Sequence, residues 1–360
     1  PRCLHRLTPW PMSPAPPFLT GTWYPIARLQ ELHRQRPLSR QVAGLPLLVG
    51  RSPQPWVLVD SCPHRGLPLR YGQVSNGVVR CKYHGWDFDT GTGQCLHIPC
   101  LTPEQRQQGV EGRLRAQSLP CRVQGGLLWA WFGHPRQPEP TAEPSALPAV
   151  FDRDPDLYLE RIFQCDIDQA VIGLMDPAHL PFIHTSWWWK QRDLKALNRE
   201  CKQFSPRGLG FVQDDHVIAQ PAKPYQVLGL PVRTEISFEL PGVRVELIRG
   251  PKGGACSFTV IAPIDATTSR VHQALYWTVP WLQPFRPLMA LLAGRFLDQD
   301  RRVVEEQQEG LRHNPPLTLI DGADTQAKWY LRLKKEYQRA LEQGDGFRNP
   351  LSPATLEWLS

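Results

Sequence analysis

Two short motifs place a thiol and an imidazole close together in the chain. Cys62-Pro63-His64 is followed, after sixteen residues, by Cys81-Lys82-Tyr83-His84. Glycine and proline flank both motifs, so each is expected on a loop at the end of a strand. Two such loops facing each other can hold a binuclear iron cluster, with two thiolates on one iron and two imidazoles on the other. The first candidate ligand set is therefore Cys62, His64, Cys81 and His84.

Zinc bound by two thiolates and two imidazoles is a competing interpretation of these four residues, and chance placement is a third. A zinc finger groups its ligands as Cys-x-x-Cys and His-x3–5-His, whereas here each half mixes cysteine with histidine. The mixed halves favour a [2Fe–2S] cluster of the Rieske type. Cys95, His97 and Cys100 lie nearby, but no Cys-x-x-His follows them, so we interpret them as structural.

A second group of candidate ligands follows about a hundred residues later, in Asp176-Pro-Ala-His179-Leu-Pro-Phe-Ile-His184. Asp176 and His179 share a face where the segment is helical, and the proline before His184 allows the chain to turn back. Two imidazoles and one carboxylate from elsewhere form the facial triad of mononuclear non-haem Fe(II). For an isolated pair, two hydrogen-bonded structural histidines would be the better interpretation. Because the candidate Rieske motif precedes this pair by about a hundred residues, we favour iron ligation over a structural role for His179 and His184.

The carboxylate is expected from a helical segment near residue 300. Asp300 is preferred there because the apolar spacing of the segment can turn one acid inward, and an inward carboxylate needs a partner such as a metal. Asp298 and Glu305 remain alternatives.

The elements that must position these residues change character along the chain. Residues 1–17 contain six prolines and are expected to form an irregular arm, and residues 135–149 form a proline-rich linker. Between them, residues 18–134 predict an all-β domain, with Asn76-Gly77 as a hairpin turn. Residues 150–345 predict a second domain, with a helix near 166–178, a series of strands over 208–280 and helices at 287–310 and 324–342. Residues 346–360 are expected to form a C-terminal tail. Because the second domain combines a large sheet with a helix before it and helices after it, the predicted fold class is α+β.

Composition excludes several classes of protein. The chain has 360 residues, of which 41% are hydrophobic and 21% charged, so it can bury a core and is not disordered. No apolar run is long enough for a membrane-spanning helix. The net charge of +7 is spread without a basic block interleaved with aromatic residues, which disfavours nucleic-acid binding. Nine cysteines without a dense framework indicate a reducing compartment, and we expect a cytoplasmic location, with or without peripheral membrane association.

Both constellations in this order resemble the Rieske non-haem iron oxygenases, over about residues 23–308. The resemblance implies a Rieske domain followed by a helix-grip catalytic domain built on an antiparallel sheet. It implies His179, His184 and Asp300 as iron ligands, and Asp176 as the bridge for electrons from the cluster of a neighbouring subunit in a homotrimer. Leu67 and Tyr83 occupy the positions where high-potential Rieske proteins carry a disulfide, so a lower-potential cluster is implied.

One position departs from this family. Many members have Asn three residues before the acid that corresponds to Asp176, and here that residue is Gly173. A hydrogen bond beside the iron site is therefore expected to be missing or supplied by another residue.

The second motif is most similar to the branch that contains pheophorbide a and chlorophyllide a oxygenases, and vanillate O-demethylase is similar in length and plan. The resemblance implies a terminal oxygenase component that uses O2 to hydroxylate a bulky hydrophobic aromatic or tetrapyrrole-like substrate. Alternatives are O- or N-demethylation, or a Rieske electron carrier without oxygenase activity. The chain lacks a dinucleotide-binding Gly-x-Gly-x-x-Gly followed by an acid. A separate NAD(P)H-dependent reductase, with or without a ferredoxin, is therefore expected as partner.

The sequence also offers candidates for the walls of a substrate site. Residues 187–189 are three tryptophans that directly follow the iron motif and either line an entrance or pack beneath a helix. The alternation of strand residues adds Phe238, Leu240 and Ile248 as candidate wall residues.

Overall fold

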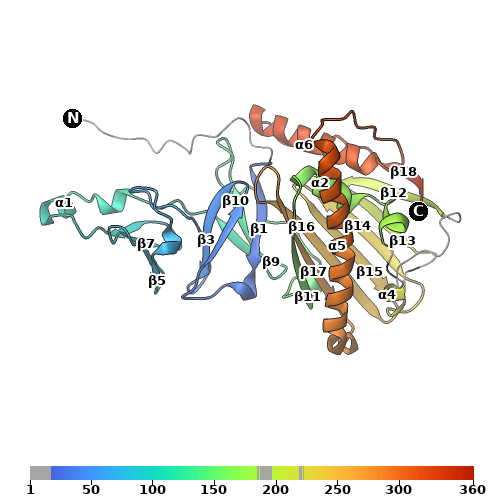
Figure 1. Ribbon diagram of the computed structural model, residues 1–360, viewed down its shortest axis with the longest axis horizontal. Coiled ribbons are helices and arrows are strands. Elements are labelled where there is room, and N and C mark those ends of the chain that lie inside the picture. Colours follow the sequence, from blue (N-terminus) through green and yellow to red (C-terminus); the bar gives the residue numbers. More distant parts are fainter. Residues whose placement is uncertain (1–17, 185, 187–196, 219–220, 222) are drawn as a thin grey trace.

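The computed structural model describes residues 18–184, 186, 197–218, 221 and 223–360. The expected arm at 1–17 and the tryptophans at 187–189 lie outside these residues. Three small antiparallel sheets form the N-terminal part, and one eight-stranded sheet with helices forms the C-terminal part (Figure 1). The α+β class is confirmed.

The N-terminal sheets stand in a row along the long axis of the molecule, with β5 and β7 at the end far from the large sheet (Figure 1). The strands are ordered β1-β10-β9, β2-β3-β4 and β5-β6-β7-β8. Their bounds are β1 Thr22–Arg28, β2 Leu38–Val42, β3 Leu45–Arg51, β4 Pro55–Val59, β5 Gln73–Ser75, β6 Val78–Arg80, β7 Asp87–Asp89, β8 Cys95–His97, β9 Cys121–Gln124 and β10 Leu127–Phe132. The short helix α1 (Pro103–Gln107) follows β8.

The hairpin predicted at Asn76-Gly77 is present between β5 and β6. Both residues have positive φ, 48° at Asn76 and 77° at Gly77. A two-residue turn of this kind matches the twist of the strands it joins and needs residues that tolerate the left-handed region. The turn sets the register of β6, which carries the chain into Cys81.

The C-terminal sheet is antiparallel throughout and is ordered β11-β17-β16-β15-β14-β13-β12-β18. The bounds of its strands are β11 Leu157–Phe163, β12 Arg199–Arg207, β13 Gly210–Val217, β14 Arg233–Glu239, β15 Val243–Gly250, β16 Gly253–Pro263, β17 Ser269–Trp277 and β18 Ala354–Leu359. The strands predicted over 208–280 correspond to β13–β17.

Helices lie on one face of this sheet and the N-terminal domain lies on the other (Figure 1). The helices are α2 Ile167–Met175, α3 Leu180–Ile183, α4 Lys223–Gln226, α5 Arg286–Leu311 and α6 Thr325–Gln343. We call the two sides the helix-facing side and the domain-facing side. Among the described helices, none is long and apolar enough to cross a membrane.

Alternation along the strands assigns side chains to the two sides. Val271 on β17 pairs with Arg161 of β11, whose side chain donates to Asp298 of α5, so both residues are helix-facing. The neighbours of Val271 along the strand alternate in direction. Ala274 and Tyr276 cluster instead with Trp129 of β10 and are domain-facing. The predicted wall residues Phe238 and Ile248 are both buried. Phe238 pairs with Arg244 and Ile248 pairs with Thr234, and all four side chains are on the helix-facing side.

The expectation of a C-terminal tail was wrong for residues 354–359. These residues form β18, which pairs with β12 and completes one edge of the sheet. The strand has a single buried side chain, Leu356, so its sequence carries too weak an alternation to predict a strand without knowledge of its partner. The strands β11 and β12 were likewise absent from the sequence prediction, which placed strands of this domain only over 208–280.

Candidate metal centres

The first candidate centre is formed by two loops, one between β4 and β5 and one between β6 and β7. The loops share one backbone pattern. In each, the cysteine N–H donates to the carbonyl five residues later, and a glycine four residues later donates back to the cysteine carbonyl. These bonds join Cys62 to Leu67 and Gly66 in the first loop, and Cys81 to Trp86 and Gly85 in the second. Gly66 and Gly85 both have positive φ, which explains the glycine in each motif.

The four candidate ligands converge at the tips of these loops. The rings of His64 and His84 have centroids 4.5 Å apart. The Nδ1 atoms of both rings are buried and make no hydrogen bond within the described part of the chain. Cys62 and Cys81 are buried and unpaired. Burial raises the pKa of Cys62 to about 11, so a thiolate there needs a metal to stabilise it.

This donor set is suited to a Rieske cluster. Two thiol sulfurs outside any disulfide and two imidazole nitrogens without a hydrogen bond stand on facing loops, and a buried nitrogen without a hydrogen bond is costly unless something else binds it. All eight described cysteines are unpaired, so no disulfide joins the loops.

Trp86 is a residue of this centre that the sequence reasoning missed. Its ring stacks on His64, with centroids 4.4 Å apart and an interplanar angle of 6°. Tyr83 lies against the other histidine, with a centroid distance of 3.9 Å, and its side chain is exposed. The position of Trp86, two residues after His84, was the available signal.

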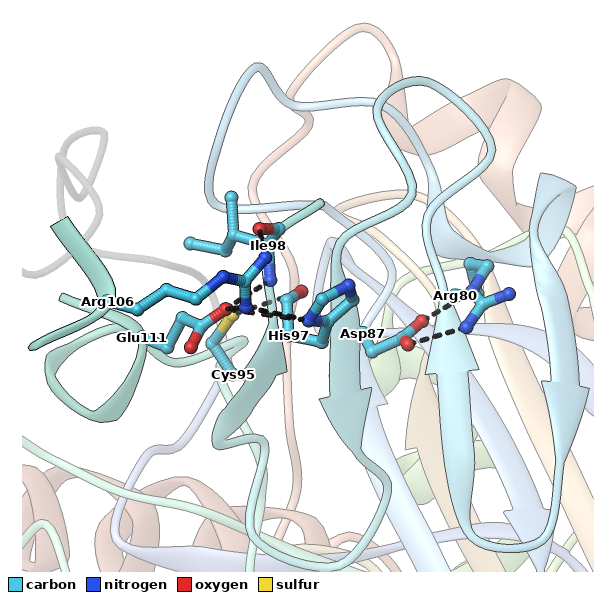
Figure 2. A network of polar contacts seen from close by, with 7 residues as sticks. All are labelled: Arg80, Asp87, Cys95, His97, Ile98, Arg106 and Glu111. Atoms are coloured by element: carbon cyan, nitrogen blue, oxygen red, sulfur yellow. Dashed lines mark hydrogen bonds and ion pairs between the residues drawn. The ribbon is translucent and has the colours of Figure 1, made fainter. Parts of the chain in front are cut away.

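The neighbouring Cys95 and His97 belong to a separate network (Figure 2). Nδ1 of His97 lies 3.0 Å from an Arg106 nitrogen, and the same guanidinium binds Glu111 and the carbonyl oxygen of Ile98. Cys95 is buried beside them. This network supports the interpretation of these residues as structural.

The second candidate centre lies where α3 meets α5. Asp166 caps α2 by accepting from the N–H of Gln169, and the helix ends at Met175 before the Asp176-Pro177 pair. The single turn of α3 then places His179 at its start and His184 at its end. The long helix α5 supplies Asp300, which is buried.

Three ligand atoms come together at this point. The Nε2 atoms of His179 and His184 are 3.2 Å apart, and each is 3.3 Å from Oδ1 of Asp300. Burial disfavours the charged form of both rings, but the Asp300 carboxylate raises the pKa of His179, whereas burial prevails at His184 and lowers its pKa. One carboxylate and two imidazoles within 4.8 Å of one another form a facial set for a divalent metal.

The two alternatives to Asp300 are engaged elsewhere. Asp298 accepts from Nε of Arg161 at 2.9 Å and pairs with Arg301. Glu305 accepts from the backbone N–H of Gln164. The geometry therefore favours Asp300.

Comparison with known proteins assigns the chain to a family. Residues 22–121 match the model of the Rieske [2Fe-2S] domain, and residues 163–336 match the C-terminal domain of vanillate O-demethylase oxygenase. The chain belongs to the Rieske non-haem iron oxygenase family. The expected resemblance is confirmed, and the Rieske domain is the part that contains the first centre.

Similar proteins include chlorophyllide a oxygenases and a demethylase. The chain is 29% identical to the Arabidopsis thaliana chlorophyllide a oxygenase, over 93% of this chain and 60% of that protein. It is 27% identical to the Oryza sativa subsp. japonica chlorophyllide a oxygenase, over 83% of this chain and 53% of that protein. The chain is 34% identical to the oxygenase component of dicamba O-demethylase from Stenotrophomonas maltophilia, over 46% of this chain and 48% of that protein. The chain thus spans about half to three fifths of these curated relatives.

Solved structures share the fold. The crystal structure of dicamba monooxygenase bound to dicamba superposes with a TM-score of 0.68 at 23% identity, covering 91% of this chain and 98% of that one. A caffeine complex of NdmA from Pseudomonas putida CBB5 has a TM-score of 0.66 at 18% identity, covering 89% and 90%. Another solved dicamba monooxygenase contains non-haem iron.

Two residues of this Rieske-family chain lie directly behind His179 and His184. Oε1 of Gln299 lies 3.0 Å from Nδ1 of His184. Since this oxygen can only accept, the ring proton sits on Nδ1 and the lone pair of Nε2 points toward Asp300. Oδ2 of Asp176 lies 3.8 Å from Nδ1 of His179. Burial raises the pKa of Asp176 despite a hydrogen bond from the N–H of Ala178.

The departure at Gly173 has a packing reason. A Cβ at this position would lie 2.5 Å from Cγ1 of Val304, so α2 and α5 approach too closely for any side chain. The residue Gln299, on α5, supplies a hydrogen bond to the iron site from the other side.

Proposed function

We propose that this chain is the oxygenase component of a Rieske system that hydroxylates a bulky, hydrophobic aromatic or tetrapyrrole-like substrate. The observation that carries the proposal is the cluster of His179, His184 and Asp300. The Rieske loops add the unpartnered ring nitrogens of His64 and His84. A Rieske electron carrier would need only the first centre. The names of the chlorophyllide a oxygenases support a large aromatic substrate.

The proposed ligands are Cys62, His64, Cys81 and His84 for the [2Fe–2S] cluster, and His179, His184 and Asp300 for one Fe(II). When bound, these groups would supply one-electron transfer and the activation of O2. The chain itself orients the ligands. Gln299 fixes the tautomer of His184, and Phe296 stacks on that ring at 3.5 Å, so the ring cannot rotate away.

Electron delivery is proposed to occur between subunits of a homotrimer. The Rieske loops follow β4 and β6, whereas α2 and α5 lie over the large sheet at the other end of the elongated molecule (Figure 1). The side chain of Asp176 behind His179 retains 34% exposure, so a second copy can reach it. A separate NAD(P)H-dependent reductase, with or without a ferredoxin, is the proposed source of electrons.

Demethylation of a methoxy or methylamino aromatic is the second candidate. The match to the vanillate O-demethylase domain and the similarity to dicamba O-demethylase favour it. Both reactions use the same two metal centres, so the choice depends on the substrate. The unpaired described cysteines support a reducing compartment, for which we propose the cytoplasm.

Iron content and spectra test the proposal. The anaerobically reconstituted protein should hold three irons per chain and show the visible spectrum of a Rieske cluster. His179→Ala should retain that spectrum, fall to two irons and lose substrate oxidation. Asp298→Asn, two residues before Asp300 on the same helix, is the matched control and should retain three irons. Two irons in the unmodified protein would leave only the electron carrier.

A further inference from the structure

A polar patch interrupts the helix-facing side of the large sheet. Arg244 on β15, Thr259 on β16 and Gln273 on β17 are paired neighbours in one row across three strands. Glu246 and Ser257 form part of the next row. We call these five residues the sheet patch. Polar side chains on a buried sheet face cost free energy unless they are hydrogen-bonded, so their partners need to be identified.

Only two members of the sheet patch have such partners. Nη1 of Arg244 donates to Oε2 of Glu246 at 3.0 Å, and the hydroxyl of Tyr225 on α4 donates to Oε1 at 3.0 Å. The side chains of Ser257, Thr259 and Gln273 make no hydrogen bond to any described residue, and Oε1 of Gln273 is fully buried. Native proteins rarely leave such an acceptor unpaired.

The sheet patch adjoins the iron site. Gln273 is two residues along β17 from Val271, which pairs with Arg161 of β11. Arg161 binds Asp298 on α5, two residues before the ligand Asp300. On the other flank, Val171 of α2 would lie 3.0 Å from a Cβ at Gly242, two residues before Arg244. The sheet patch therefore lies close to α2 and α5, and α5 carries the proposed ligand Asp300.

The charges of the patch decide which chemical group it suits. Arg244 and Glu246 neutralise each other, so an additional buried carboxylate would be left without a counter-charge, at high cost. A neutral group can be buried there without an uncompensated charge. Oε1 of Gln273 requires a donor, while Arg244 has guanidinium donors beyond Nη1 for an acceptor.

We propose that the sheet patch recognises a neutral substituent that carries both a hydrogen-bond donor and an acceptor, such as an amide or lactam, on the aromatic substrate. This inference rests on the proposed function, because it assumes a substrate between the sheet and the iron. Gln273 is the main specificity-determining residue, with Thr259 and Arg244 beside it. A site built to hydrogen-bond a substrate discriminates strongly against analogues that lack the group.

Calorimetry on the iron-loaded enzyme tests the inference with three probes: methoxybenzamide, methoxybenzoate and methoxytoluene. The amide should bind about tenfold more tightly than either of the others. Gln273→Met keeps the size of the side chain but removes its hydrogen bonds, and should abolish the preference. Ser237→Ala, a buried polar change on the domain-facing side, is the control and should retain it.

Stability separates recognition from a structural role. If the side chain of Gln273 is unpaired until a substrate binds, the variant Gln273→Met without a probe should unfold at the same temperature as the unmodified chain or at a higher one. The substitution removes an unpaired buried polar atom. Any one of three results would overturn the inference. They are equal affinities for the three probes, a preference for the amide that persists in Gln273→Met, and a lower unfolding temperature of Gln273→Met than of the unmodified chain. Iron content is measured in the same samples, so a failure of the proposed function appears there as a missing third iron.

Discussion

At the scale of single residues, the function depends on groups that would be poorly placed without a metal. His64 and His84 bury unpaired nitrogens, and His179 and His184 point theirs at the same carboxylate oxygen. Residues that do not bind metal hold these groups in place. Gln299 does so by a hydrogen bond with His184, and Trp86 does so by stacking on His64. Asp176 lies 3.8 Å behind the ring of His179.

Asp176 provides a test at this scale. Asp176→Asn should retain three irons and the Rieske spectrum, because the carboxylate lies 3.8 Å from a ring nitrogen of His179 that faces away from the site. Turnover per iron should fall by about tenfold or more, because the carboxylate that we propose as the electron bridge between the two centres is lost. Iron assay, visible spectroscopy and product formation measure these effects. Unchanged turnover would contradict the bridging role.

At the scale of elements, the iron site depends on the contact between α2 and α5. Val171, Ala170 and Met175 of α2 are buried in the same cluster as Leu297 and Val304 of α5. Gly173 allows the helices to come this close, since Cγ1 of Val304 occupies the space of a side chain. The distance between α2 and α5 in turn sets the position of α3 relative to Asp300.

Gly173→Ala should therefore be destabilising, by about 1–3 kcal/mol, because the added methyl group overpacks the interface. Val304→Ala in the same chain should recover much of the loss. Gly310→Ala is the matched control, since nothing lies within 4 Å of its Cβ position, and it should be neutral or stabilising by up to about 1 kcal/mol. Urea unfolding measures all three. Equal stability of Gly173→Ala and the unmodified chain would contradict the packing argument.

The edge strand β18 gives a second prediction at this scale. Leu356 is buried in the core cluster beneath β12, so Leu356→Ala should cost about 2–4 kcal/mol. Thr355 is exposed on the same strand, and Thr355→Ala should change stability by less than about 0.5 kcal/mol. Thermal unfolding compares the two variants. Similar effects of both would show that β18 does not contribute to the core.

At the scale of the whole molecule, a buried polar group lies between the Rieske domain and the large sheet, beside the hydrophobic cluster that contains Trp129 and Tyr276. His272 on β17 is fully buried on the domain-facing side. The hydroxyl oxygen of Tyr158 lies 2.6 Å from Nδ1 of His272 and donates to Oε2 of Glu160 at 3.2 Å, and Arg270 lies beside them. From the N-terminal domain, Arg40 faces the same group. Burial, with the charges of Arg270 and Arg40, lowers the pKa of His272 to about 3.

This shift predicts how stability depends on pH. Above the ordinary histidine pKa of about 6.5, His272 is neutral in both the folded and the unfolded chain, and it contributes no pH dependence. Below that value the unfolded chain takes up a proton that the folded chain does not, so stability falls toward pH 3. By pH 5.5 the loss should reach about 1.4 kcal/mol.

His272→Gln should remove this part of the loss. The decrease in unfolding free energy between pH 7.5 and 5.5, measured by urea unfolding, should be about 1.4 kcal/mol smaller than in the unmodified chain. His33→Gln replaces an exposed histidine and should leave the decrease unchanged. Identical pH profiles for all three proteins would contradict the assignment of a neutral His272.

The sequence by itself was enough to predict the candidate ligands of both centres, because metal ligands are limited to a few residue types and their local spacing is set by loops and helical turns. It also determined the strands β13–β17 and the helices α5 and α6, whose periodic patterns are long. Tertiary structure alone decided which acid faces the histidines, because Asp298, Asp300 and Glu305 differ only in what lies opposite each one. Long-range pairing likewise decided β18 and the rows of the sheet patch, since register between distant strands leaves no local signal.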